Sequence, residues 1–297
     1  MPQARWMRLS ELLRQYAAQH DYGVAGTTLS QYRYALTSLK KHLGHDPTTA
    51  DLTDSAITGW VDWLRDHRSP HTARTQRGSV LTLWRWAWMA DVVDQPPKRV
   101  RKLRMPAPAP ESWSAEDGAR LIGQAEQVPS QFRGLSLSRS YHLVAFLRVA
   151  WDSGLRLGDV LRIKPVEVQP DGRLDVVQHK TRVRQTIRLW PETVAAIGET
   201  MADEPDRELI FPLAARRYQE WIARLARQCE LRGSVKWIRR GVGTAAEVEG
   251  GYGSKMLGHT DQRTLRFYLD RSAIEPAVAP RIPVVAARMT AALATNG

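Results

Sequence analysis

Four short segments in the second half of the chain carry side chains suited to chemistry on a phosphate ester. They are SGLRLGD at 153–159, HKT at 179–181, KWIRR at 236–240 and LGHTDQRTLRFY at 257–268. An arginine fork can hold phosphate oxygens in a planar, bidentate fashion. A lysine can give a proton to a departing oxygen, and a tyrosine hydroxyl can act as a covalent nucleophile. These residue types therefore suit attack on a phosphodiester.

Each of these residues has an ordinary structural interpretation when it is taken alone. Arg156 and Lys180 could be solvated surface residues, and Lys236 and Arg239 could lie on the exposed face of a helix. Tyr268 is one of eight tyrosines, and a tyrosine at helical spacing is usually a packing residue. The information therefore lies in the order of the residues along the chain.

That order resembles the tyrosine recombinases, the phage integrase family, and the nine-residue interval from the histidine to the tyrosine matches the family's pattern. The resemblance covers nearly the whole chain, since a helical domain, a linker and a mixed catalytic domain form that family's two-domain plan. No extra N-terminal domain is expected before residue 7, which favours an Xer-like architecture. The matching positions are Arg156, Lys180, Lys236, Arg239, His259 and Tyr268.

The resemblance implies a role for each position. Arg156 and Arg239 would hold the non-bridging phosphate oxygens, where negative charge builds during attack. Tyr268 would be the nucleophile, and Lys180, on a turn that reaches into the minor groove, would be the general acid for the departing 5′ oxygen. His259 would hydrogen-bond a phosphate oxygen. Because a phosphotyrosyl ester conserves the energy of the cleaved bond, no cofactor and no metal are expected.

Two further positions complete the expected site. Asp159 occupies the family's acidic position and is expected to support an arginine or the local turn. Lys236 stands where most family members have histidine, although the family tolerates lysine there. A lysine is a cation at neutral pH, and it cannot accept the tyrosine proton unless its surroundings change this. We therefore expect Lys236 to contact phosphate or donate a proton, while the cationic pocket and His259 help Tyr268 to lose its proton.

No other catalytic motif competes with this interpretation. The sequence contains no Walker loop, no dinucleotide fingerprint and no HExxH motif. Its carboxylates do not cluster as a two-metal nuclease would need. The nearest alternative is a type IB topoisomerase, which uses the same nucleophile chemistry. A second alternative is a DNA-binding relative with impaired catalysis, an idea to which Lys236 lends some weight.

The elements that must position these residues form two domains. Apolar residues at helical spacing predict four helices between residues 7 and 92, within a helical core-binding domain at 1–93. Residues 113–297 would be the catalytic domain, with a small antiparallel hairpin predicted by alternation at 173–178 and 183–189. The predicted fold class is mainly α with a small antiparallel β-sheet in the second domain. By resemblance it is that of the DNA breaking-rejoining enzymes.

Residues 94–112 read as a basic, proline-rich linker, because prolines forbid regular helix and stiffen an extended chain. An ordinary solvated spacer and part of a clamp around DNA are both open interpretations. The DNA contacts are expected in this linker and at the start of the fourth helix, where a merely solvated basic turn is the alternative. The residues concerned are His71, Thr72, Arg74, Arg77, Lys98, Arg99 and Arg101.

Packing and assembly add further expectations. Trp84 and Trp88 share one face of the fourth helix and should lie in the core, whereas Trp86 should point elsewhere, toward another domain or subunit. Residues 272–297 are expected to hold a weakly apolar helix after Pro283, and this tail would dock on its own domain or on a neighbour. The resemblance implies a homotetramer on two DNA duplexes joined through a Holliday junction, a monomer or dimer when free, and accessory proteins in some members.

The bulk composition agrees with double-stranded DNA as a partner. The net charge is +12 over 297 residues, which suggests a polyanionic partner, although some soluble proteins are simply basic. Cys229 is the only cysteine, so no intramolecular disulfide and no cysteine-based zinc site can form. The start lacks the apolar core of a signal peptide, and no stretch approaches a membrane span. We therefore expect a cytoplasmic, nucleoid-associated protein with no membrane contact.

Overall fold

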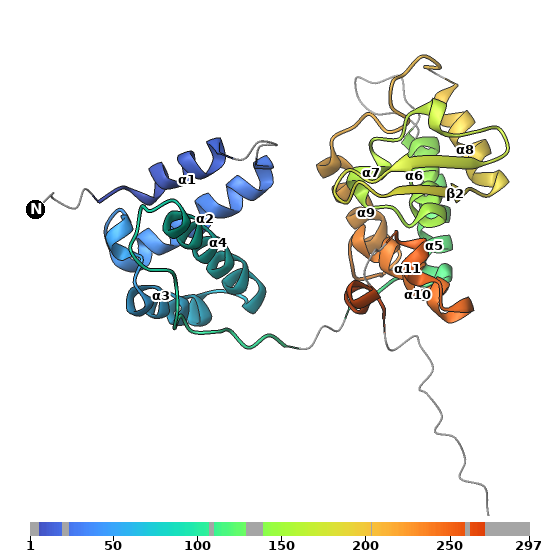
Figure 1. Ribbon diagram of the computed structural model, residues 1–297. Helices are drawn as coiled ribbons and strands as arrows, with labels where there is room; N and C mark the ends of the chain where they lie inside the picture. The colour runs from blue at the N-terminus through green and yellow to red at the C-terminus, as the bar shows by residue number, and fades with distance from the viewer. Residues whose placement is uncertain are drawn as a thin grey trace, which may run out of the picture. The chain divides into compact units, whose positions relative to one another are not determined.

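The chain divides into two compact units, Met1–Ala107 and Pro108–Gly297 (Figure 1). Over the described residues the structure is mainly helical with one small antiparallel sheet, which confirms the predicted fold class. The computed structural model describes residues 6–19, 24–106, 110–128, 139–202, 204–258 and 262–270.

The first unit holds the four predicted helices. Thr53 caps the third helix by accepting the Ala56 N–H at 3.2 Å. Ser69 caps the fourth by accepting the Thr72 N–H at 3.3 Å, and Pro70 occupies the first helical position. The helices are α1 (Leu9–Ala18), α2 (Gly26–Leu43), α3 (Asp54–His67) and α4 (Pro70–Met89), with a short 3₁₀ helix at Thr49–Asp51.

The tryptophans of α4 are arranged differently from the expectation. Trp84 is buried as predicted, but Trp88 is 44% exposed, so its predicted core position is wrong. Trp88 lies beside the buried stripe, in the last turn of the helix. Trp86 packs at the margin of the same core, with its ring edge-on to Tyr16 at 5.6 Å between centroids. Trp86 therefore packs within the first unit.

The first half of the expected linker also belongs to this unit. Val100 is buried in the helical core. Asp54, at the start of α3, accepts the backbone N–H of Lys98 at 3.0 Å and that of Arg99 at 2.9 Å. The structure thus corrects the expectation that 94–112 is a uniform spacer, because side chains far away in the sequence supply the hydrogen bonds that fix its first half.

The second unit is built around α6, whose side chains are buried through most of its length. Ser114 and Asp117 form a capping box at the start of α5. The helices are α5 (Ala115–Glu126), α6 (Arg139–Ser153), α7 (Leu157–Val160), α8 (Pro191–Met201), α9 (Ala215–Gln228), α10 (Lys236–Gly250) and α11 (Gly253–Met256), with 3₁₀ helices at Pro165–Glu167 and Gln262–Phe267.

The predicted hairpin consists of β1 (Arg173–Val177) and β2 (Arg184–Arg188), which pair antiparallel (Figure 1). Leu174, Val176 and Ile187 are buried toward the core, as the period of two requires. The hairpin packs against α6. Its turn, residues 178–183, is thereby held near the carboxyl end of that helix.

Gly154 ends α6. Its N–H donates to the Ala150 carbonyl at 3.1 Å, and its φ of +56° lies in the left-handed region that glycine adopts without strain. The chain reverses there, and Arg156 becomes the residue that precedes α7. This local geometry places the Arg156 side chain beside the hairpin turn.

Candidate active site

One cavity of about 630 Å³ brings together most of the expected catalytic side chains. Its wall contains Arg156 from the start of α7, Lys180 from the hairpin turn, Lys236 and Arg239 from α10, and Tyr268. These residues are up to 112 positions apart in the sequence. His259 lies outside the described residues, as does the segment 272–297.

Arg239 is the buried cation of this group, with 5% of its surface exposed. Its Nη1 donates to the Gly154 carbonyl at 2.5 Å, and its Nη2 donates to the Leu257 carbonyl at 2.8 Å. Burial, followed by repulsion from Arg156, lowers its pKa to about 10, so the side chain is still a cation at neutral pH. A guanidinium carries five N–H donors in a planar fork, a geometry that suits the binding of phosphate oxygens.

Tyr268 lies directly beside this cation. Its ring centroid is 5.3 Å from Cζ of Arg239, so the guanidinium lies over the aromatic ring. The segment is fixed on both sides of the tyrosine. The Tyr268 N–H donates to the Leu265 carbonyl at 2.8 Å, and the Asp270 N–H donates to Thr244 Oγ1 of α10 at 3.0 Å. The phenol is thus held against α10.

Arg156 and Asp159 lie at the two ends of one turn. Arg156 Nη1 donates to the side-chain oxygen of Gln178 and lies 4.0 Å from Asp159 Oδ2. The other carboxylate oxygen of Asp159 accepts the His179 N–H at 2.8 Å. The buried Asp159 therefore contacts both an arginine and the hairpin turn, the two supports that the sequence left open.

The two lysines are exposed at the rim of the cavity. Lys180 follows His179 in the hairpin turn, and Lys236 is the first residue of α10. An exposed ammonium on a turn can swing toward a bound phosphate. Lys236, in contrast, starts from a rigid helix end.

Three residues that sequence reasoning did not single out also shape the site. Gln178 is fully buried beside Arg156, and Gln185 joins the hairpin to α11 by donating to the Met256 carbonyl at 2.6 Å. Arg240 lines the cavity. One signal was present in the sequence: Gln178 continues the inward-facing alternation of Leu174 and Val176, and a polar residue there is unusual.

The expected DNA-contact residues of the first unit fall into two groups. His71, Thr72, Arg74, Lys98 and Arg99 are exposed. Arg77 and Arg101 instead hold the 98–104 segment. Arg77 Nη2 donates to the Val100 carbonyl at 3.2 Å, and Arg101 pairs with Asp62 at 3.1 Å.

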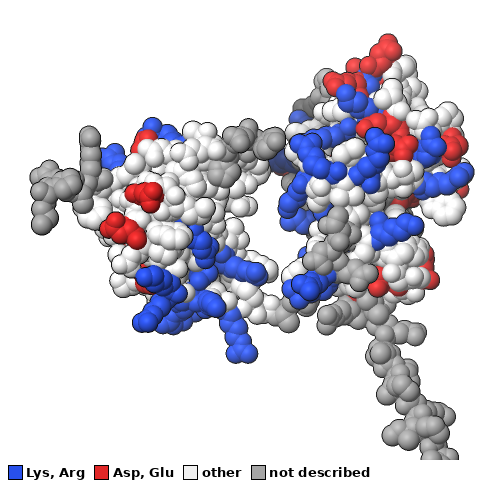
Figure 2. Space-filling view, in the orientation of Figure 1, with Lys and Arg blue, Asp and Glu red and all other residues white. Residues whose placement is uncertain are grey.

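In the space-filling view, Lys and Arg side chains gather along one side of the first unit, around α3 and the segment that follows the four helices (Figure 2). Lys and Arg side chains are also visible over the second unit. Arg77 and Arg101 therefore act first as supports for a basic surface. The exposed cations of the segment that follows α4 are Lys98, Arg99, Arg101, Lys102 and Arg104.

None of the helices among the described residues is both long and apolar enough to cross a membrane. Nor do three or more His, Cys, Asp or Glu side chains of those residues gather as they would around a metal ion.

The fold that positions this cavity is the fold of the tyrosine recombinases. The structure matches a lambda integrase dimer bound to a COC′ core site with a TM-score of 0.73 and 17% identity, covering 94% of this chain and 82% of that one. A lambda integrase tetramer bound to a Holliday junction matches with a TM-score of 0.72 and 18% identity, over 93% and 81% of the two chains.

A third structure extends the comparison to another recombinase. XerH site-specific recombinase bound to its difH substrate, in a pre-cleavage complex, matches with a TM-score of 0.67 and 12% identity, over 87% of this chain and 80% of that one. No protein-family model and no curated protein matches the sequence. At these identities the likeness shows a shared fold, and the activity rests on the chemistry of the site.

Proposed function

We propose that this protein is a site-specific DNA recombinase that cleaves and rejoins DNA through a 3′-phosphotyrosyl intermediate. The observation that carries the proposal is the single cavity lined by Arg156, Lys180, Lys236, Arg239 and Tyr268. These five residues supply a nucleophile, two guanidinium groups and two ammonium groups, which is the set of groups that attack on a phosphodiester requires.

In the proposed step, the Tyr268 oxygen forms a bond to phosphorus while the bond from phosphorus to the 5′ oxygen breaks. Arg156 and Arg239 stabilise the charge on the non-bridging oxygens, and Lys180 transfers a proton to the departing 5′ oxygen. The tyrosine proton leaves to solvent or to His259. A 5′ hydroxyl then attacks the phosphotyrosine, so that one phosphoester replaces another without an external energy source.

The proposal extends to the assembly that exchanges strands. A lambda integrase tetramer with this fold is bound to a Holliday junction, and XerH is bound to its difH substrate. We propose that four copies of this chain act on two duplexes in the same way. The exposed residues His71, Thr72 and Arg74 of α4, together with Lys98 and Arg99 of the segment that follows the helices, would contact the sugar-phosphate backbone.

The test is covalent trapping. The protein is incubated with a pool of nicked duplexes whose sequence around the nick is randomised. Cleavage close to the nick releases a short fragment that carries the new 5′ hydroxyl. Loss of this fragment prevents rejoining, so the covalent adduct accumulates. Adducts that survive denaturation are recovered and their DNA is sequenced. We expect adducts with the native chain and none with Tyr268→Phe. An adduct that persists in the Phe variant would sink the assignment of the nucleophile.

The same experiment separates the alternatives. A catalytically impaired DNA-binding relative would retain DNA in a filter-binding assay and give no adduct. A type IB topoisomerase would give adducts and relax supercoiled plasmid but would not join two duplexes. The recovered sequences, placed on two labelled duplexes, should yield recombinant strands and a Holliday junction if the proposal holds.

A further inference from the structure

Gln178 lies at the end of β1, two residues before Lys180, and its side chain is completely buried. Leu174 and Val176 precede it on the same inward face of the strand. For core packing alone, an apolar side chain would be sufficient at this position. A buried amide is tolerated only where each polar atom finds a partner, so its contacts indicate what it does.

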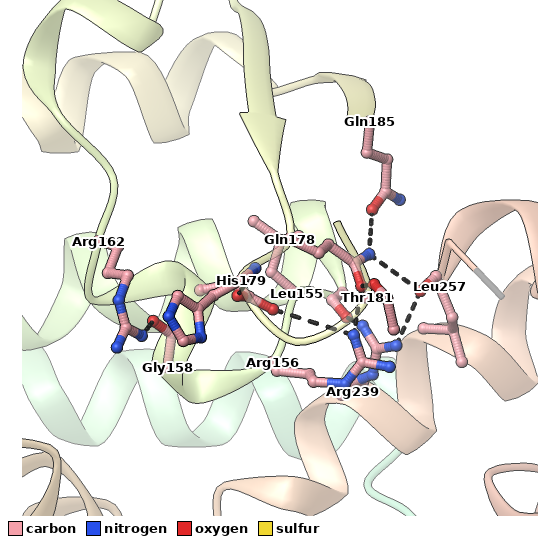
Figure 3. Close-up of polar contacts among 12 residues, drawn as sticks. Leu155, Arg156, Gly158, Arg162, Gln178, His179, Thr181, Gln185, Arg239 and Leu257 are labelled. Atoms are coloured by element: carbon pink, nitrogen blue, oxygen red, sulfur yellow. Dashed lines mark hydrogen bonds and ion pairs between the residues drawn. The ribbon is translucent and has the colours of Figure 1, made fainter. Parts of the chain in front are cut away.

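The Gln178 amide uses its full hydrogen-bonding capacity. Its oxygen accepts from Arg156 Nη1 and from Thr181 Oγ1, the latter at 3.1 Å. Its nitrogen donates to Gln185 Oε1 at 2.6 Å and to the Leu257 carbonyl at 3.3 Å (Figure 3). The orientation of the amide is unambiguous, because a guanidinium only donates and a backbone carbonyl only accepts.

The backbone of Gln178 closes the turn that carries Lys180. The Gln178 N–H donates to the Val183 carbonyl at 2.9 Å, and the Gln178 carbonyl accepts from the Arg182 N–H at 2.8 Å. The base of the turn is therefore held on both sides. Lys180 itself stays exposed at the tip, where it lines the cavity.

Besides Arg156 and the turn that carries Lys180, the Gln178 amide also holds the turn at Leu257 and Gly258. The Leu257 carbonyl that accepts from Gln178 also accepts from Arg239 Nη2. Gly258 has a φ of +60°, and a Cβ at that position would lie 2.4 Å from Gln178 Nε2. The turn is therefore shaped around the amide, and a chain of contacts runs from Arg156 through Gln178 and Leu257 to Arg239.

From these contacts we propose that Gln178 is a positioning residue, which fixes the Lys180 turn relative to Arg156 and Arg239 so that the ammonium reaches the departing 5′ oxygen. The inference rests on the proposed function, since it concerns the proton transfer of that same reaction. Gln178 acts through the position of Lys180 and does not itself touch the phosphate.

The test is a double-mutant cycle on the rate of covalent-adduct formation. Gln178→Met keeps the length of the side chain and removes all four hydrogen bonds. We expect it to slow adduct formation by about 10- to 100-fold, the scale on which a misplacement of about 1 Å acts. If the loss arises through Lys180, the variant Gln178→Met, Lys180→Ala will be no slower than Lys180→Ala alone.

Thr200→Val is the matched control. Thr200 is also buried, at 3% exposure, and its hydroxyl lies 3.3 Å from His142 Nδ1 in another part of the unit. This variant should lose stability and keep its rate. The variant Thr200→Val, Lys180→Ala should therefore form the adduct at the same rate as Lys180→Ala alone.

Thermal unfolding accompanies each rate, so that a folding defect is recognised. If Gln178→Met does not fold, Gln178→Glu takes its place. The carboxylate keeps the contact with Arg156 but cannot donate to the Leu257 carbonyl, and the same cycle with Lys180→Ala applies. A wild-type rate for the folded Gln178 variant, or fully multiplicative losses in the cycle, overturns the inference and leaves the recombinase proposal standing. Absence of adduct with the native chain overturns both.

Discussion

The Cζ atom of Arg239 lies 5.3 Å from the centroid of the Tyr268 ring, while the same guanidinium binds the carbonyls of Gly154 and Leu257. One buried cation thus ties the end of α6, the turn after α11 and the proposed nucleophile to a single point. Because the cation is anchored before any DNA binds, its position relative to the phenol costs no reorganisation during the reaction.

Arg239→Lys should therefore abolish most activity although it keeps the charge. An ammonium cannot hold two carbonyls and also bind phosphate in bidentate fashion. We expect adduct formation to fall by about 10²- to 10³-fold, as when an oxyanion donor is lost. The melting temperature should fall too, since an unpaired buried carbonyl costs about 1–3 kcal/mol. Arg216→Lys, in an exposed ion pair on α9, is the control, and equal losses in both variants would contradict the prediction.

Lys180→Ala should be rescued by a better leaving group. With ordinary DNA we expect adduct formation to slow by about 10²- to 10⁴-fold, the usual contribution of a general acid. With sulfur in place of the bridging 5′ oxygen, the departing thiolate needs no proton, and the variant should approach the native rate.

Arg182→Asn removes another cation from the same turn, and asparagine tolerates the φ of +56° found there. This control should be slowed by the same factor on both substrates. Lys180→Ala that is equally slow on oxygen and sulfur would remove Lys180 from the proton transfer.

Lys236→His tests whether position 236 supplies the base for Tyr268. Lys236 is exposed at the start of α10 and lines the cavity, which suits contact with phosphate. We expect the acidic limb of the pH–rate profile to stay where it is in the native chain. A new limb near the ordinary histidine pKa of about 6.5 would instead reveal that a base at this position contributes.

Arg74→Ala should weaken DNA binding uniformly across sequences. Arg74 is exposed in the first turns of α4, beside Thr72 and His71. If it contacts one phosphate, the slope of log K against log salt should become shallower by about one unit. Arg14→Ala makes the same charge change in α1, where Arg14 pairs with Glu11, and its salt slope should match that of the native chain. Identical slopes in all three proteins would remove Arg74 from the interface.

His142 should make the second unit less stable in acid. Burial, followed by the charge of Arg207, lowers the pKa of His142 to about 3. An unfolded histidine has a pKa of about 6.5, so below that pH the unfolded chain binds a proton that the folded chain rejects. The free energy of unfolding should then fall by at most about 1.4 kcal/mol per pH unit between pH 6.5 and 3.

Urea unfolding at pH 7.5, 5.5 and 4.5 measures this slope. His142→Gln lacks the titrating ring. The slope of its free energy of unfolding against pH should be smaller than that of the native chain by an amount that corresponds to at most one proton. The two slopes are compared and not the absolute stabilities, because the variant also alters the contact with Tyr218. Equal slopes would show that His142 is not the group responsible.

What the sequence by itself determined was local structure and the order of the reactive residues. The caps at Ser69 and Ser114, the glycine end of α6 and the alternation of the hairpin each depend on groups a few residues apart, so their spacing is visible in the chain. The order from Arg156 to Tyr268 is likewise a property of the sequence. These signals were enough to indicate the fold class.

Only the tertiary structure decided which side chains complete the site and where the linker begins. Gln178 meets Leu257 across 79 positions, and Asp54 holds Arg99 across 45. Such pairs have no fixed spacing, because they depend on how helices and turns pack after they form. Trp88 shows the same limit, since helical periodicity gives its angle on α4 but does not show which neighbour covers it.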